Sequence, residues 1–572
     1  MARRWTFGTD SFGSLVTAVA PHLIGSGQLQ VAQNVSHAIA GAAGASNNDL
    51  LMHSTGGSAA LGLKVLRIGG EVVAMSADQT DIYSNGVSVG ASGGNVPHRF
   101  VGDSLRAYCF NGYANSVWDG TTLRAFGPFG SDWLNVSNDA ETMLVENDDS
   151  TPADIAGVYK WAASYRITLA SGIVIESKLY PLWIDSGGDP DDNFEGSITL
   201  TTSDGVYMWM RQVTQAEVDA WCGDLGAGKV EGVFWRTKAG GVDYWQDAVV
   251  SEANIVGNVG RYGQHDTAKD ADLGALYVES NNAHEVPPSG ANLAVFCQRR
   301  LFVAVKGERK LYFSGIDNYD YFDPSDTTDA EDSIEALNVI GESVAVITPS
   351  GIRLWSPVDA TGQWSNTSSS VGTTHSDGHF MTDRGLMFTR EDGVYLFDGV
   401  GSKRISEQID PTWGAGPWKA AYSNGKAYFT NGSLVVEFEI VGGDILWSTR
   451  PTSMTDAYSE VSDDHTDGGI WGTDISGDIY KIHGGSGLNT AIRQTKDYGD
   501  GNVRHWDRLT VDFEGTLSAV VTTNRGATQT VAFTATNRLR TRTMLGTDMI
   551  GELCSVTLTG TGTPYGVELE TT

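Results

Sequence analysis

The chain has 572 residues, enough for two to four domains, and its 70 glycines and sparse helical periodicity indicate an all-β protein with many tight turns. Its formal net charge of −32 would repel the phosphates of nucleic acids and anionic lipids, so a protein that grips DNA is disfavoured. No run approaches the roughly 18 apolar residues that span a bilayer, so we expect no membrane-spanning segment.

One hairpin unit recurs along the chain: an apolar strand, a short polar turn that usually holds a glycine, and an alternating strand that ends in an aromatic residue. Two looser copies cover 71–83 and 106–118, and five copies in register cover 300–313, 343–355, 385–397, 426–438 and 469–480. Their near-constant interval matches one propeller blade. We therefore expect a β-propeller of about seven blades, formed by residues 1–130 and 289–484. Hairpins stacked in separate sandwiches are the alternative.

Residues 131–288 interrupt this rhythm and are expected to form a domain inserted in a blade loop. Alternating strands within 156–177 and a hairpin over 230–245, which turns at Gly240 and Gly241, favour a fibronectin-like β-sandwich. A Thr cap followed by Glu three residues later predicts a short helix over 214–222.

From about residue 485 the spacing changes again, and alternating runs predict a C-terminal β-domain over 485–572. Basic residues are concentrated here, at Arg493, Lys496, Arg504, Arg508, Arg525, Arg538, Arg540 and Arg542. In so acidic a chain this region is a candidate for docking onto an acidic neighbour, with an ordinary solvated face as the alternative.

The order of several short motifs resembles the propeller-bearing tail nozzle, tail hub and packaged-DNA-stabilisation proteins of short-tailed, podovirus-like bacteriophages. The likeness spans nearly the whole chain. It is carried by 27–35, Trp118-Asp-Gly120, Ile175-Glu-Ser177, Val233-Phe-Trp-Arg-Thr237 with Gly240-Gly241, Asp266-Thr267 with 272–274, 300–302, 311–314 with Asn318 and Tyr321-Phe322, and Leu558-Thr-Gly-Thr-Gly562.

This resemblance implies a structural virion protein of the tail, assembled in the host cytoplasm, that forms or closes the DNA channel below the portal and retains packaged DNA until ejection. It also implies that copies of the chain form a ring, with six copies expected. This ring would contact portal or adaptor proteins and tail fibre or spike proteins. Genomic DNA would pass without sequence-specific binding, because an acidic wall repels phosphates. The family brings no catalytic residues and no cofactor.

The sequence offers no nucleophile elbow, metal-binding His-Glu-x-x-His helix, phosphate loop or zinc-ligand cluster, so we expect no enzyme, no catalytic, cofactor-binding or metal-binding residues and no cofactor. His375 and His379 are the only close histidine pair and are expected to face solvent. The acidic stretch Asp185–Asp192 has oxygen ligands at a density typical of calcium sites but lacks the closing Glu and the Gly placement of an EF-hand loop, so a solvated loop is expected. Asp317, Asp320, Asp323 and Asp326 alternate with aromatic residues and leave the same two interpretations open. The four cysteines, Cys109, Cys222, Cys297 and Cys554, lie far apart and are expected to be buried free thiols.

Two rival functions stay open. A receptor- or glycan-binding tail module could use the sandwich tryptophans Trp183, Trp209, Trp221, Trp235 and Trp245, most of which we expect in the core. A propeller glycan hydrolase is a minor alternative, because the stretch 356–364 only imitates, with shifted spacing, a turn found in such enzymes.

Overall fold

The computed structural model is almost entirely β-structure. It describes residues 3–7, 31–33, 35–36, 44–45, 50–55, 58–121, 123–126, 144–147, 155–168, 174–184, 194–201, 204–215, 218, 230–257, 260–278, 287–288, 290–319, 321–323, 325–356, 362–365, 367–413, 416–441, 443–450, 460–464, 469–474, 476–483, 491–494 and 498–571. In these ranges the helical segments with defined bounds are short, α3 (Glu252–Ile255) and η4 (Glu407–Thr412). None of the described helices is long and apolar enough to cross a membrane.

The described strands include six four-stranded antiparallel sheets and one further group of four antiparallel strands, β38–β41, at the end of an 11-stranded sheet, and these seven groups are blades of a β-propeller. In chain order they are β6 (Gly62–Ile68) to β9 (Val87–Ala91), β10 (Arg99–Gly102) to β13 (Leu123–Ala125), β26 (Leu293–Cys297) to β29 (Thr327–Asp329), β30 (Ala336–Ile340) to β33 (Gln363–Ser365), β34 (His379–Thr382) to β37 (Ser402–Arg404), β38 (Lys419–Ser423) to β41 (Asp444–Arg450), and β42 (Glu460–Asp464), β43 (Gly469–Thr473) and β44 (Ile479–Ile482) with β5 (Leu50–His53).

Each hairpin predicted from the sequence supplies the two central strands of one blade. These pairs are β7 (Glu71–Ala77) with β8 (Asp81–Ser84), β11 (Ala107–Phe110) with β12 (Ser116–Trp118), β27 (Arg300–Ala304) with β28 (Lys310–Phe313), β31 (Ser343–Ile347) with β32 (Ile352–Ser356), β35 (Gly385–Arg390) with β36 (Gly393–Phe397), β39 (Lys426–Thr430) with β40 (Val435–Val441), and β43 with β44. The predicted propeller fold is therefore confirmed, and the described residues form seven such blades.

The chain divides into two compact units, and five of the blades lie in the unit made of residues 1–66, 72–97 and 332–572. Successive blades in this unit bury apolar side chains between them, for example Ile347 against Phe388 and Leu63 against Trp471. One face of each hairpin is covered in this way, because a single blade cannot bury its own apolar surface.

The other unit, residues 67–71 and 98–331, holds the two remaining blades and the insertion. Aromatic side chains fill the space between these blades. Tyr108 and Phe110 of β11 pack in one cluster with Leu301 and Val303 of β27, and Phe322 completes it.

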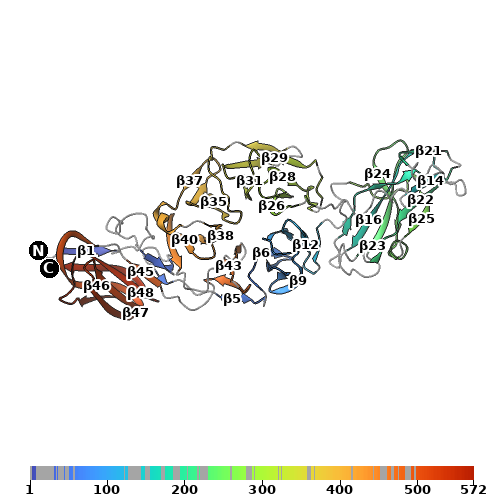
Figure 1. Ribbon diagram of the computed structural model, residues 1–572. Helices are drawn as coiled ribbons and strands as arrows, with labels where there is room; N and C mark the ends of the chain where they lie inside the picture. The colour runs from blue at the N-terminus through green and yellow to red at the C-terminus, as the bar shows by residue number, and fades with distance from the viewer. Residues whose placement is uncertain are drawn as a thin grey trace. The chain divides into compact units, whose positions relative to one another are not determined.

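A strand from near the N-terminus completes the last blade (Figure 1). β5 pairs antiparallel with β44, with Ile479 opposite His53 and Tyr480 opposite Leu51. The outer strand of this blade thus comes from residues more than 400 positions away in the sequence, which ties the early part of the chain to its late part.

The C-terminal β-domain is built on the long strand β46 (Tyr498–Thr523). β46 pairs with β47 (Thr528–Met544), β48 (Ile550–Gly560) and β49 (Thr563–Thr571), and β48 also pairs with β45 (Ala491–Gln494). The predicted β-structure of this region is therefore present. Its core holds Trp506, Phe513 and Val556, in one cluster with Phe438 and Trp447 of the blade β38–β41.

The predicted boundary of the N-terminal blades, residues 1–130, differs from the pairing in the structure. β1 (Arg3–Phe7) pairs with β49, and β2 (Val31–Gln33) lies between β45 and β41, so both belong to the sheet of the C-terminal domain. Short strands such as these carry no sign of their partner, because their pairing is set by residues far away in the sequence.

The insertion is a β-sandwich, as expected. The first sheet has the strand order β17 (Val174–Glu176), β16 (Trp161–Thr168), β23 (Val230–Thr237) and β24 (Tyr244–Val250), and β18 (Tyr180–Pro181) also pairs with β16. The second sheet has the strand order β20 (Phe194–Glu195), β19 (Trp183–Ile184), β14 (Leu144–Asn147), β22 (Val206–Arg211) and β25 (Arg261–Asp266). A core including Tyr165 and Phe234 from the first sheet and Met208 from the second joins them. β14 and β19 are parallel, and a two-stranded sheet pairs β15 (Gly157–Tyr159) with β21 (Ile198–Leu200).

Most of the predicted helix over 214–222 lies outside the described residues. Gln215 and Val218 are helical, and the Val218 N–H donates to the Thr214 carbonyl at 3.2 Å. Cys109, Cys297 and Cys554 are free and buried, as predicted, while Cys222 is not described. Burial raises the pKa of the Cys109 thiol to about 12.

A close approach of two glycines shapes the C-terminal domain. The pairing of β46 and β47 shifts between Phe513 and Gly515, where Gly515 has a φ of +88°. A Cβ atom at this position would lie 2.7 Å from the Cα of Gly562, in the closing motif 558–562. Only glycine fits this bulge without strain and collision.

We predict that Gly515→Ala lowers the free energy of unfolding by about 2–4 kcal/mol, because it adds left-handed backbone strain to a steric collision. Gly526→Ala is the matched control, since Gly526 also has a positive φ, +86°, but open space around its Cα. Urea unfolding followed by tryptophan fluorescence measures both. Equal losses in the two variants would show that the glycine contact is unimportant.

Candidate functional site

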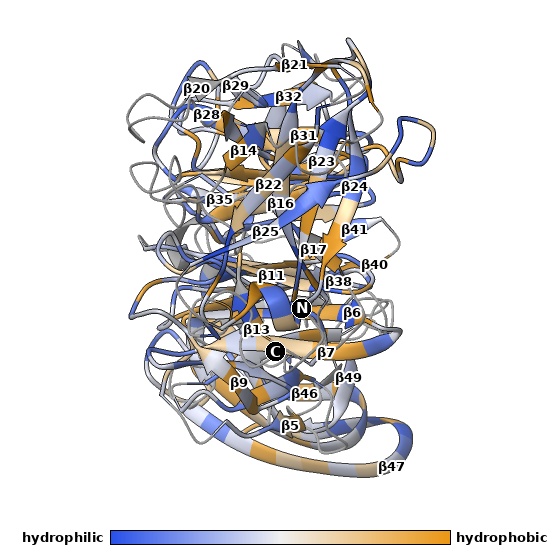
Figure 2. Cartoon of the chain, turned by 90° about the vertical axis from the view of Figure 1, so that its right-hand side faces the viewer, coloured by the Kyte–Doolittle hydropathy of each residue, from blue (hydrophilic) through white to orange (hydrophobic). Residues whose placement is uncertain are grey.

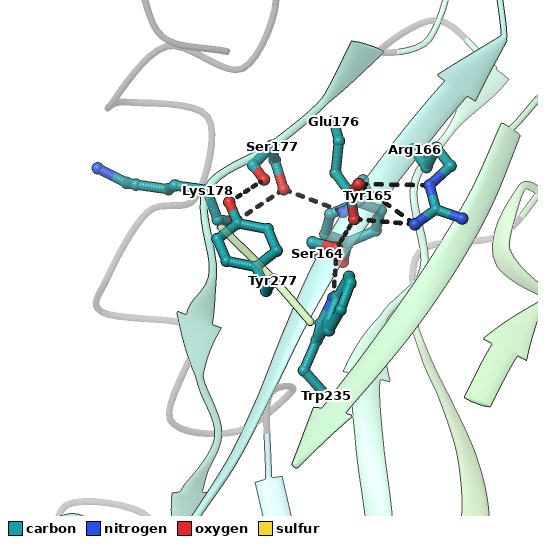
Figure 3. Close-up of polar contacts among 8 residues, drawn as sticks. All are labelled: Ser164, Tyr165, Arg166, Glu176, Ser177, Lys178, Trp235 and Tyr277. Atoms are coloured by element: carbon teal, nitrogen blue, oxygen red, sulfur yellow. Dashed lines mark hydrogen bonds and ion pairs between the residues drawn. The ribbon is translucent and has the colours of Figure 1, made fainter. Parts of the chain in front are cut away.

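The inserted sandwich contains a buried hydrogen-bond network around Glu176 (Figure 3). The Ser164 hydroxyl donates to the Glu176 carboxylate at 2.7 Å, and the Trp235 indole N–H donates to the Ser164 Oγ at 2.8 Å. Arg166 forms an ion pair with Glu176 at 3.2 Å. The network therefore links β16, β17 and β23 through side chains as well as through the backbone ladder.

A second set of contacts fixes the segment around Ser177 beside this network. The Tyr165 N–H donates to the Ser177 Oγ at 3.0 Å, and that hydroxyl donates to the Lys178 carbonyl at 2.9 Å. The Tyr277 hydroxyl donates to the Ser177 carbonyl at 3.0 Å. Ser164, Ser177 and Glu176 are buried, so these groups hold the sheet in register and are closed to a substrate in solvent.

A second buried polar cluster lies around Arg236, the residue that follows Trp235 on β23. Its guanidinium is fully buried, pairs with Asp266 at 3.0 Å and Asp270 at 2.8 Å, and lies over the Tyr159 ring at 4.9 Å. The Trp161 indole N–H donates to Asp266 at 2.9 Å. Asp266 is thus held by a cation and a neutral donor in the interior.

A β-bulge brings a second carboxyl group to this cluster. Phe234 pairs with Ala248 and Trp235 with Gln246, so Asp247 is the extra residue on β24. Burial and then the negative charge of Asp266 raise the pKa of Asp247 to about 8. Burial also raises the pKa of Asp266, against the lowering effect of Arg236. Sequence reasoning missed the pairing of these acids, because it depends on the bulge.

The tryptophans proposed for receptor binding do not form one group. Trp235 is buried in the network above, whereas Trp183, Trp209 and Trp245 are partly exposed. The Trp245 ring lies 3.8 Å from the Lys238 Nζ, and Trp209 carries Arg261 over its ring at 4.2 Å. Trp221 lies outside the described residues. The expectation that most of the set is core is therefore wrong for the partly exposed three.

The basic residues of the C-terminal domain form a ladder of ion pairs across β47, β46 and β49. Arg538 pairs with Asp512 at 2.7 Å, Arg540 with Glu568 at 2.5 Å, and Arg542 with Glu570. Arg508 also reaches Glu570 at 3.5 Å, and Arg525 pairs with Glu552 at 2.7 Å. The acids opposite these arginines come from the same domain, so the cluster is largely neutralised internally. Burial lowers the pKa of Arg493 to about 9, and Lys496 is not described.

The remaining candidates have structural contacts. His375 is buried and its Nδ1 lies 3.0 Å from the Thr389 hydroxyl, so the expectation that it faces solvent is wrong; the His379 Nδ1 lies 2.8 Å from the Asn338 amide. Asp317 pairs with Arg299, Asp323 accepts from Tyr321 at 3.1 Å, and Asp326 lies 3.7 Å from Arg300.

Several of the predicted positions are not described. They are Asp185–Asp192, Asp320 and residues 357–361 of the stretch 356–364 that imitates a glycan-hydrolase turn. Across that stretch, Trp355 and Trp364 pack ring against ring on neighbouring strands at 5.1 Å. Among the described residues, no group of three or more His, Cys, Asp or Glu side chains could hold a metal ion.

No protein-family model matches the chain, and no curated protein matches it. Solved structures give distant similarities. The computationally designed Ika8 protein has 10% identity, 76% coverage of this chain and 99% of its own, with a TM-score of 0.33. YCF48 bound to D1 peptide has 10% identity, covers 60% of this chain and 93% of its own, and has a TM-score of 0.25. The extracellular domain of the putative hybrid two component system BT3049 from B. thetaiotaomicron has 9% identity, covers 84% of this chain and 82% of its own, and has a TM-score of 0.27. At these scores the assignment of the fold depends on the chain's own sheets.

We predict that wild-type stability falls as the pH rises from about 4 to 8. In this window the folded protein keeps a proton on Asp247 that the unfolded chain has lost, so the free energy of unfolding decreases with pH. Asp247→Asn removes this proton uptake and should flatten the decline in melting temperature measured by calorimetry at each pH.

Asp243→Asn provides the control, because Asp243 is an exposed acid of the same hairpin. It should leave the pH profile as in the wild type. The interpretation is wrong if Asp247→Asn and Asp243→Asn give the same slope between pH 5 and 8.

Proposed function

We propose that this chain is a structural virion protein of a bacteriophage tail, of the nozzle, hub or adaptor type. Copies of it assemble into a ring that forms or closes the DNA channel below the portal and retains packaged DNA until ejection. Support comes from the order of the sequence motifs and from the propeller with its inserted sandwich. The observation that carries the proposal is an exposed edge strand suited to contact between copies.

That edge is β47, which is 17 residues long and, among the described strands, pairs only with β46. Figure 2 shows it as a long curved strand in which polar and apolar residues alternate. Leu539 is 48% and Met544 62% exposed. A long edge with exposed apolar side chains is a template for pairing with another chain, and natural proteins usually protect such edges.

The charge distribution favours a contact at this domain. A chain of net charge −32 repels its own copies, and this repulsion is weakest where acids are matched by cations. Residues 498–571 hold six arginines against eight acidic residues, so this domain is close to neutral. Two copies can therefore approach through it at lower electrostatic cost than through the acidic remainder.

The acidic residues outside this domain fit the proposed role of the chain in a DNA channel. A channel wall of negative charge repels DNA phosphates within a Debye length of about 8–10 Å, so the genome can slide without being trapped at binding sites. The portal or adaptor and the tail fibre or spike are the proposed partners of the ring.

We predict that Leu539→Lys/Met544→Lys abolishes ring formation, because the added charges repel each other across the edge and remove its apolar contacts. Mass photometry with negative-stain class averages, with and without the portal complex, measures the assembly. The wild type should give a ring, with six copies expected, and the double variant a monomer of wild-type melting temperature.

The matched control is Val242→Lys, at a valine in the sandwich that is 83% exposed. It should assemble as the wild type does. A wild-type chain that stays monomeric or trimeric with the portal would overturn the ring, and a double variant that still forms rings would remove β47 from the interface.

A further inference from the structure

A cavity lies between two neighbouring blades of the propeller, the blade β34–β37 and the blade β38–β41. Its volume is about 530 Å³, within the roughly 300–1,000 Å³ that is typical of ligand pockets. The two blades pack on each other through Phe380 and Tyr422, whose rings stack at 5.4 Å, and Figure 1 shows the blades side by side. One wall of the cavity comes from β37 and the residues after it, and the other comes from the start of β41.

The strands that border the cavity have open edges. Among the described strands, β37 is the last strand of its sheet and pairs only with β36. The residues Asp444–Trp447 of β41 pair with β40, and the other described neighbour of β41 on this side, β2, is in register with it only at Thr449. Open strand edges offer the backbone groups that an extended peptide uses when it lies along a sheet.

Part of the cavity wall is apolar. Ile405, Ile445 and Leu446 line it and are partly buried, and the fully buried Trp447 lies among the same residues. Ile405 and Ile445 also pack against the core that the propeller shares with the C-terminal domain. An apolar side chain of a ligand would therefore leave water on entering the cavity, which favours binding.

A fixed cation lies at one side of this wall. The Arg384 guanidinium donates to the carbonyl of Gly443, which belongs to the other blade. A guanidinium has five N–H groups, so this contact holds Arg384 in place and leaves donors for an acceptor in the cavity. Arg384 forms no ion pair with a carboxylate of the described residues. Arg404, which also lines the cavity, already has other contacts.

The cavity also has charges of both signs that do not neutralise one another. Lys403, Glu407 and Asp444 line it with exposed side chains, and these side chains form no ion pair or hydrogen bond within the described part of the chain. Their charged atoms are therefore kept apart across the cavity. A ligand that carries one positive and one negative group can satisfy both signs at once, whereas a simple anion or cation would be repelled by half of them.

We infer that this cavity is a binding site for a short zwitterionic peptide with an apolar side chain. The C-terminal carboxylate of the peptide pairs with Arg384 and Lys403. Its N-terminal ammonium group pairs with Glu407 and Asp444, and its apolar side chain packs on Ile405. The inference goes beyond the ring-forming role and is independent of it, since both blades belong to one chain.

The test uses the purified full chain and three peptides of increasing length, Leu-Leu, Leu-Gly-Leu and Leu-Gly-Gly-Leu, because the separation of the two charges grows with length. Each peptide is compared with its N-acetylated form, which lacks the positive charge, and with its C-terminal amide, which lacks the negative one. In titration calorimetry at least one free-ended peptide should bind, and either cap should weaken its binding ten-fold or more.

Two variants assign the two ends of the peptide. Arg384→Gln/Lys403→Gln should abolish the preference for the free carboxylate over the amide and leave the preference for the free ammonium group. Glu407→Gln/Asp444→Asn should have the reverse effect, because it removes only the acids. A variant that lost both preferences together would contradict the assignment of separate ends.

The matched control is Arg309→Gln/Lys310→Gln, which removes an exposed arginine and an exposed lysine at the start of β28 in another blade. It should bind the peptides as the wild type does, and melting temperatures establish that each variant is folded. The inference is overturned if no free-ended peptide binds, if capped and free forms bind alike, or if the folded Arg384→Gln/Lys403→Gln variant keeps the wild-type preference for the carboxylate.

Discussion

The architecture depends on strand pairing between the two ends of the chain. β5 supplies the outer strand of the last blade, while β1 and β2 pair with strands of the C-terminal domain. None of these sheets can be completed until the late residues are present, so the entropy of closing very long loops must be overcome before the contacts form. The same pairing protects the blade edges, because β5 covers β44 and β2 covers β41, which leaves β47 as the long exposed edge of this sheet.

The blades could be predicted because each is a local unit. A hairpin such as 385–397 contains its own turn, its own alternation and its terminal aromatic residue, and the structure places it at the centre of one sheet. The outer strands and the N-terminal pairings could not be predicted in this way. Val31–Gln33 is too short to carry a periodicity, and its partners, β45 and β41, are chosen by the packing of distant segments.

The side-chain arrangements of the sandwich could not be predicted from the sequence for a related reason. Trp209 could be named as an exposed aromatic candidate, but its relation to Gly263 and Arg261 exists only through the register of β22 with β25. In the same way, Asp247 reaches Asp266 only because a bulge adds one residue to β24. A shift of one residue in one of these pairings would move the side chains of that strand to the opposite face and disrupt the arrangement that depends on it.

The sandwich and the blades of the same unit are joined by two adjacent residues that pack in different cores. Tyr321 packs with Trp235 and Tyr277 at the sandwich, whereas its neighbour Phe322 packs in the core between the two blades of the same unit. One short segment thus couples the insertion to the propeller through adjacent side chains. If the chain forms a ring at the tail, such a coupling would fix the insertion relative to these two blades, so that a contact made by the insertion is transmitted as force on the blades and is not absorbed by a loose linker.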